Sequence, residues 1–322
     1  MGLRVISLRH NDICQFKNIS PQLTRKSLER FKRLTENGCV PLHLHTEKGA
    51  RSSRSVYVIP AYGRLSDLRL PDSIREKASA IRSRENAKAG GRWVDSDKLA
   101  VDSLGILPGT ISALVTKMKL SETLAMKHFG IEDICRLKAF RLNTNAHVTA
   151  RDNGREVLLV AQKETTPSGK RMGDNALLSE KTRGGLASNG MFDADVISSE
   201  KRAGDAWESC CRKEFEEETG ISLETTNPDY LGLVMDTVQP VGAIGILGIL
   251  RAELETKQID EARKKANGSA GIAALDTIPM EGSAMARYLR ENRDSMVPQL
   301  ITGLVILGYE NWGAEFLRQA DK

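Results

Sequence analysis

The sequence predicts a mixed α/β protein in two parts, and three observations support this. Runs rich in β-branched residues alternate with segments whose apolar residues recur at helical spacing. The 322 residues suffice for two modest domains, and 40% hydrophobic with 28% charged residues is ordinary for a globular chain. Residues 1–140 contain 25 Lys and Arg against 14 Asp and Glu, a net charge of +11, whereas residues 141–322 carry −6. We therefore expect a basic N-terminal α/β lobe at 1–140 and a second domain at 141–322.

The N-terminal lobe combines predicted helices and strands without a recognisable motif. The stretch PQLTRKSLERFKRL (21–34) predicts an amphipathic helix, and PLHLH and SVYVIPAY predict short strands. The apolar pattern at 104–139 favours helices. The role of this lobe is not predicted, but its positive charge suits an anion such as a nucleotide or RNA.

The second domain opens with a predicted hairpin. Two β-prone runs flank Asp152, Asn153 and Gly154, and Asn-Gly is a strong turn signal because both positions tolerate positive φ. DYLGLVMDTV and GAIGILGILRAEL predict further strands, and residues 297–320 predict one or two helices. The longest apolar runs, 241–250 and 300–309, are about half of the roughly 20 residues that a membrane span needs, so we expect core elements and no membrane.

The cysteines and the first residues of the chain favour a cytoplasmic protein. The five cysteines are an odd number, and no pair has the C-x-x-C spacing of a zinc or redox site, so reduced thiols are expected. The opening MGLRVISLRHND lacks the apolar stretch of a secretory signal.

The most informative stretch is CRKEFEEETGI (211–221), which places four glutamates within five positions. At about 100° of rotation per residue, Glu217 lies near −60° and Glu218 near +40° from Glu214, whereas Glu216 lies near 200°. Trp207, Cys211 and Phe215 form an apolar stripe at roughly +20° to +100°. Three carboxylates therefore share or border the buried face, and Glu216 is expected to face solvent.

This arrangement of charge opposes helix formation unless a cation offsets it. Carboxylates near a helix C-terminus oppose the macrodipole, and like charges at i, i+4 repel each other. Mg²⁺ or Mn²⁺ takes oxygen ligands, and carboxylates at i, i+3 and i+4 suit a single hard cation. Gly220 is expected to end the helix in the left-handed conformation, with Ile221 anchored in the core.

The segment KEFEEETGI (213–221) resembles the second half of the Nudix box, in which arginine and glutamate precede an apolar residue, a glutamate pair and a glycine. Eight of its nine positions agree or are unconstrained, and the exception is Lys213 in place of arginine. The resemblance implies an α/β/α sandwich with a mixed sheet. It also implies metal ligands at Glu214, Glu217 and Glu218, and a catalytic set of Glu214, Glu217 and Lys213. Lysine keeps the charge of arginine but loses its planar fork.

The first half of the box matches less well. Counting back from Lys213 places Asp205 at the position of a box glutamate and Ser199 at that of the box glycine. The glycine pair of RGGLASNG makes Gly185 the better candidate, which implies 14 inserted residues before the helix. We therefore expect residues 186–198 to form an inserted loop. Gly185, Asp205 and Gly220 are the expected structural residues of the box.

The resemblance implies metal-dependent hydrolysis of a diphosphate bond in a nucleoside diphosphate linked to another moiety. Three alternatives remain. The first is a hydrolase for RNA caps or other nucleic-acid termini that uses the basic lobe, and the second is a catalytically weak Nudix-fold binding or regulatory module. The third is an isoprenoid-diphosphate isomerase, for which no cysteine–glutamate pair can be assigned.

Substrate contacts are not predicted. The aromatic residues Phe192, Trp207 and Tyr230 are better explained as core, and Lys170 and Arg171 as loop residues.

Overall fold

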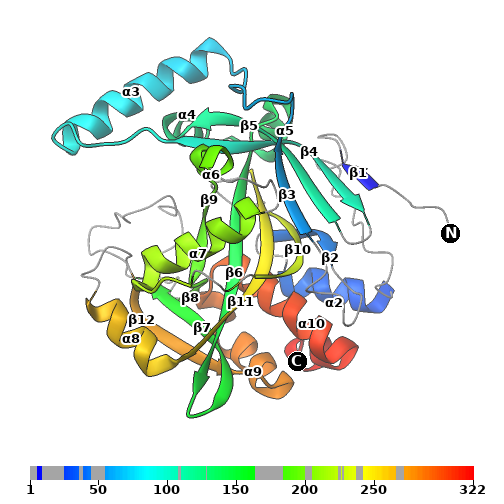
Figure 1. The fold of residues 1–322 in the computed structure, drawn as a ribbon. Coiled ribbons are helices and arrows are strands. Elements are labelled where there is room, and N and C mark those ends of the chain that lie inside the picture. The colour runs from blue at the N-terminus through cyan, green and yellow to red at the C-terminus, as the bar shows by residue number, and fades with distance from the viewer. Residues whose placement is uncertain are drawn as a thin grey trace.

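The computed structural model describes most of the chain and gives one extensive mixed sheet with helices around it (Figure 1). The described residues are 6–8, 25–35, 39–44, 55–107, 110–127, 129–163, 184–199, 205–223, 226, 228–236, 242–265 and 272–322. Within these ranges no helix is long and apolar enough to cross a membrane.

Twelve strands are formed by the described residues. They are β1 (Ile6–Leu8), β2 (Cys39–Leu44), β3 (Ser55–Pro60), β4 (Asp97–Leu107), β5 (Thr110–Lys119), β6 (Phe140–Asp152), β7 (Arg155–Lys163), β8 (Gly184–Gly185), β9 (Ser188–Met191), β10 (Asp229–Asp236), β11 (Ala243–Glu255) and β12 (Ile272–Pro279). The main path runs β2-β10-β11-β6-β4-β5-β3, while β1 pairs with β4, β9 with β6, and β7 with β6, β8 and β12. The pairs β6–β11 and β3–β5 are parallel, so the sheet is mixed.

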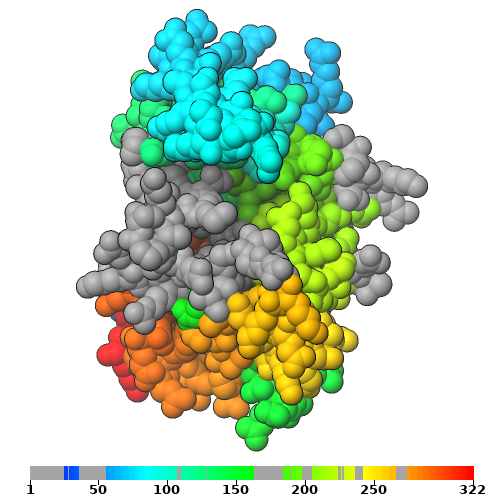
Figure 2. Space-filling view, turned by 90° about the vertical axis from the view of Figure 1, so that its left-hand side faces the viewer, coloured from blue at the N-terminus to red at the C-terminus, as the bar shows by residue number. Residues whose placement is uncertain are grey.

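Helices lie between and around these strands. The described helices are α2 (Arg25–Thr35), α3 (Asp72–Lys88), α4 (Leu120–Ala125), α5 (Ile131–Leu137), α6 (Ala194–Ser199), α7 (Asp205–Thr219), α8 (Thr256–Lys265), α9 (Gly282–Asn292) and α10 (Pro298–Ala320), with a 3₁₀ turn at Arg293–Ser295. In the space-filling view, α3 forms one end of the molecule and α8 and α9 form part of the other (Figure 2).

The central strands β6 and β11 are covered on both faces. Ile244 and Ile246 of β11 pack into the core cluster that contains α7, whereas Leu247 packs into the cluster that contains α10. Because successive side chains of a strand point to opposite faces, a strand buried on both sides needs a continuous apolar run. This requirement explains the apolar run predicted as a core element at 241–250, of which residues 243–250 form the fully buried part of β11. The layer order at this point is helix, sheet, helix.

Several elements that the sequence predicts are confirmed. The amphipathic helix is α2, with Phe31 and Leu34 fully buried. The hairpin joins β6 to β7, and Asn153 (φ 50°) and Gly154 (φ 78°) both have positive φ. The strands predicted at PLHLH, SVYVIPAY, DYLGLVMDTV and GAIGILGILRAEL are β2, β3, β10 and β11, and the C-terminal helix is α10.

The helical expectation for residues 104–139 is wrong for its first part. Residues 104–107 belong to β4 and residues 110–119 to β5, and the described helices of this range are α4 and α5. In β5, Ile111, Ala113 and Val115 are buried and alternate with part-exposed residues, which is the period of a strand with one buried face.

The two parts predicted from charge share one sheet. Strand β6 begins at Phe140, beside the expected boundary, yet it pairs with β4 from the N-terminal lobe. Strand β2, also N-terminal in sequence, pairs with β10 along the other edge. The charge asymmetry is therefore a property of the sequence halves and does not mark a spatial gap.

The cysteine expectation holds for two of the described residues and fails for a third. Cys210 and Cys211 are free and buried. Cys135 is disulfide-bonded, so the expectation that all cysteines are reduced thiols is wrong for it.

Residues 186–198 are not an inserted loop. Their β9 pairs with β6 from Asn143 to Ala146, and α6 follows directly. Ala187 and Phe192 are fully buried in the main core. The sequence did not predict this strand because the stretch around SNG is short and polar, and because its pairing partner lies about 45 residues away in sequence.

Deleting residues 186–198 is therefore expected to give an insoluble product. The deletion removes the strand that pairs with the central strand β6 together with Phe192, whose truncation to alanine alone would cost about 3–5 kcal/mol. Expression in soluble form, with the circular dichroism of the full chain, would contradict this assignment. Phe192→Ala serves as the graded variant and should lower the denaturation midpoint without abolishing folding.

Candidate active site

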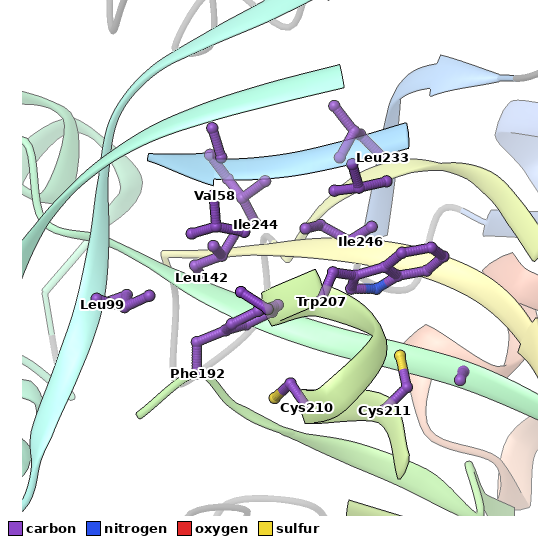
Figure 3. Packing of buried hydrophobic residues seen from close by; sticks show 14 of the residues in the cluster. Val58, Leu99, Leu142, Phe192, Trp207, Cys210, Cys211, Leu233, Ile244 and Ile246 are labelled. Atoms are coloured by element: carbon purple, nitrogen blue, oxygen red, sulfur yellow. The ribbon is translucent and has the colours of Figure 1, made fainter. Parts of the chain in front are cut away.

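The candidate site is built on α7, the helix that the spacing of its apolar residues predicts. Trp207, Cys211 and Phe215 are buried in the core cluster that also contains residues of β6 and β11, as expected. Figure 3 shows Trp207 and Cys211 among these core residues. The Thr144 hydroxyl of β6 lies 2.7 Å from the Cys211 sulfur. The Ser188 hydroxyl of β9 donates to the Cys211 carbonyl at 2.8 Å. These contacts fix the rotation of α7 about its axis and its position relative to β6 and β9.

The end of α7 confirms the predicted cap. Gly220 has φ 73°, and its N–H donates to the Glu216 carbonyl at 2.7 Å. The Thr219 hydroxyl donates to the Phe215 carbonyl at 2.7 Å. Ile221 then packs against the main core, so the chain leaves the helix in one direction.

Three of the four glutamates have the exposure that their helical positions predict: Glu216 is exposed, and Glu214 and Glu218 are half-buried. Glu217, expected to border the buried face, is 59% exposed instead. Glu214 lies deepest, because its carboxyl group rests on the backbone of β9 at Gly190. A Cβ atom at Gly190 would lie 1.9 Å from Cδ of Glu214.

Gly190 is the functional position that the sequence reading missed. Gly185, the expected box glycine, lies in β8 and pairs with Ala161 of β7. Among the described glycines, Gly190 is the one whose missing side chain the Glu214 carboxyl group requires. A glycine inside a strand often marks a close approach, and this signal was available once SNGM was assigned as a strand.

The surroundings of Glu214 favour its protonated form. Burial is the main cause, and the charges of Glu217 and Glu218 add to it, so that the pKa of Glu214 is raised to about 7. The positive charges of Lys98 and Lys213 act in the opposite direction without reversing the shift. Glu214 therefore changes charge near neutral pH.

Asp193 stands between two lysines beside these carboxylates. The Lys213 ammonium lies 3.2 Å from Oδ2 of Asp193 and 3.8 Å from Oε1 of Glu217, while the Lys98 ammonium binds Oδ1 of Asp193. Burial alone would raise the pKa of Asp193, but the bonds to Lys98 and Lys213 offset it and hold that pKa below its usual value. The Asp193 carboxyl group is thus held ionised.

Asp205, an expected structural residue of the box, lies at the opposite end of α7 from the glutamates. Asp205 occupies the first turn of α7, about 12 Å along the axis from Lys213 at 1.5 Å per residue. It is placed favourably for the helix dipole instead. Lys213 pairs with Glu217 of the same helix and more closely with Asp193, which comes from the segment between β9 and α6.

The donor chemistry of α7 suits a hard divalent cation. Glu214, Glu217 and Glu218 offer carboxylate oxygens. Burial is the main cause of the raised pKa of Glu214, and the charges of Glu217 and Glu218, which a cation would neutralise, add to it. In the described part of the chain, no three His, Cys, Asp or Glu side chains already converge as a metal-binding group.

A cavity of about 420 Å³ lies beside Asp193. It is bounded by β4, β5 and α6, with Leu65, Ser96, Asp97, Lys117, Asp193, Ala194 and Asp195 in its lining. The aromatic residues Phe192, Trp207 and Tyr230 are fully buried, which agrees with their prediction as core. Lys170 and Arg171 lie outside the described residues.

Fold and site together define a mixed α/β protein with a carboxylate-bearing helix packed against its sheet. No protein-family model matches the chain, and no curated protein matches it significantly.

Proposed function

We propose that this protein is a Nudix-type hydrolase that cleaves a diphosphate bond in a nucleoside diphosphate linked to another moiety, with Mg²⁺ or Mn²⁺. The observation that carries the proposal is the position of Glu214. Its carboxyl group is half-buried against Gly190 and electrostatically coupled to Glu217 and Glu218 on the same helix. A carboxylate buried beside two others lowers the stability of the fold, and such costly groups are typical of functional sites.

The side chains have distinct roles in the proposed reaction. Glu214, Glu217 and Glu218 would hold the cation, which supplies charge neutralisation at the diphosphate and activation of water. The pKa of about 7 belongs to Glu214 in the metal-free protein, and a bound cation would lower it, so that Glu214 would bind the metal in its ionised form. Lys213, bonded to Asp193 and facing Glu217, would fix the helix relative to the segment after β9.

A small nucleotide derivative is favoured over a nucleic acid. Lysines of the N-terminal lobe near the site are ion-paired: Lys98 with Asp193, Lys119 with Asp97 at 2.8 Å, and Lys117 with Asp97 at 3.6 Å. Paired lysines offer a phosphate chain less attraction than the net charge of the lobe suggests. If the substrate were a nucleic acid, its binding should weaken steeply with added salt, and this dependence distinguishes it from a small nucleotide derivative.

The test is a turnover assay of the wild type and Glu217→Gln across ADP-ribose, NADH, diadenosine polyphosphates, nucleotide sugars, nucleoside triphosphates and capped RNA. Turnover should require Mg²⁺ or Mn²⁺ and should fall at least about tenfold in Glu217→Gln, as expected when a charge near the reacting group is removed. Glu216→Gln is the matched control on the exposed face of the same helix, and it should retain wild-type turnover.

Two results would count against the proposal. Near-normal turnover of Glu217→Gln with Mg²⁺ would refute the metal site. No turnover by the wild type on any substrate would favour the catalytically weak binding module instead.

A further inference from the structure

Lys98 of β4 connects the N-terminal lobe to the candidate active site. Its side chain is 13% exposed, and its ammonium binds Oδ1 of Asp193. The backbone is also joined here, because the Leu99 N–H donates to the Phe192 carbonyl at 3.0 Å and Lys98 forms an isolated bridge with Asp193. Lys98 is therefore held in place by both its main chain and its side chain.

The same carboxylate binds the catalytic helix. Asp193 Oδ2 lies 3.2 Å from the ammonium of Lys213, and Lys213 precedes Glu214 directly. A carboxylate that accepts from two cations through its two oxygens fixes both partners, since charge-assisted hydrogen bonds are short and directional. The chain of contacts runs from β4 through Asp193 to α7.

We propose that Lys98 is a positioning residue of the active site, which acts through Asp193 to hold Lys213 and the glutamates of α7 in place. The N-terminal lobe thereby becomes part of the catalytic unit. This inference rests on the proposed function for its catalytic consequence, but the positioning itself can be measured without substrate.

The kinetic test uses Lys98→Met, which keeps the length of the side chain and removes its charge. Loss of a residue that orients a metal ligand typically lowers activity 10–100-fold, so kcat should fall at least about tenfold while KM stays within about twofold. Lys98→Arg should restore most of kcat. Asp193→Asn should give a similar loss, and the double variant should be no worse than either single variant, because the two residues act in one chain of contacts.

The substrate-free test measures amide hydrogen exchange over residues 188–199 and 205–219. Both Lys98→Met and Asp193→Asn should accelerate exchange in these segments. Lys119→Met is the matched control, because Lys119 is also ion-paired with an aspartate of β4, namely Asp97, but does not contact Asp193 in the described structure. It should leave both segments unchanged.

The outcomes separate this inference from the proposed function. Wild-type exchange and wild-type kcat in Lys98→Met would overturn the positioning role while leaving the hydrolase intact. Equal effects of Lys98→Met and Lys119→Met would also overturn it, because general charge in the lobe would then be the cause. Accelerated exchange in a protein without turnover would support the positioning role and refute the hydrolase.

Discussion

Glu214→Gln is expected to abolish most turnover while making the metal-free protein more stable above pH 7. Turnover should fall on the order of 10²–10³-fold, as expected when a charge held at the reacting centre is removed. Glutamine matches the shape of glutamate, so the packing against Gly190 is kept. The variant separates the catalytic contribution of the carboxylate from its effect on folding.

The stability gain follows from the sign of the pKa shift. The pKa of Glu214 rises from 4.5 to about 7 on folding, chiefly through burial, so the unfolded chain loses its proton first as the pH rises. The free energy of unfolding of the wild type therefore falls between about pH 4.5 and pH 7 and stays low above that window. At about 1.4 kcal/mol per unit, the difference has an upper value of about 3 kcal/mol, which solvent access reduces.

Urea denaturation in the presence of a chelator measures this effect. Glu214→Gln should unfold at higher urea than the wild type at pH 8 and at the same urea at pH 4. Glu216→Gln, exposed on the same helix, should show no such crossover. A Glu214→Gln variant that retains turnover, or that is less stable at pH 8, would contradict the assigned position of this carboxyl group.

Acid is expected to destabilise the protein through His147 of β6. The imidazole is fully buried against Gly303 of α10, where a Cβ atom would lie 1.9 Å from Nε2. Neither ring nitrogen has a hydrogen-bond partner among the described residues. Burial lowers the pKa of His147 from 6.5 to about 4.

The direction of the pH effect is fixed by that shift. As the pH falls below 6.5, the unfolded chain takes up a proton that the folded protein accepts only near pH 4. The stabilisation is fully present above pH 6.5 and is lost down to about pH 4, a loss of about 3 kcal/mol at about 1.4 kcal/mol per unit.

The measurement compares the wild type with His147→Leu, which removes the titrating group and keeps a similar volume. The difference in free energy of unfolding between the two proteins should change by about 3 kcal/mol between pH 7.5 and pH 4. Carboxylates elsewhere contribute equally to both proteins and cancel. A constant difference across this range would show that His147 is accessible to protons in the folded state.

Much of α7 was predictable because its information is local. The apolar stripe of Trp207, Cys211 and Phe215, the exposure of Glu216 and the cap at Gly220 all follow from helical spacing and backbone preference. The partner of Lys213 was not predictable in this way. Asp193 lies 20 residues before it, and only the packing of β9 and α6 against α7 brings the two side chains together.

The sequence by itself determined the α/β class, the Asn153-Gly154 hairpin, the buried central strands and the carboxylate-bearing helix. Each depends on periodicity or on backbone preferences within a short stretch. The tertiary structure alone decided that Gly190 supports Glu214, that Asp193 bonds both Lys98 and Lys213, and that His147 is buried beneath α10. These contacts join residues distant in sequence, and they exist only where the pairing of β9 with β6 and the packing of both sheet faces bring the residues together.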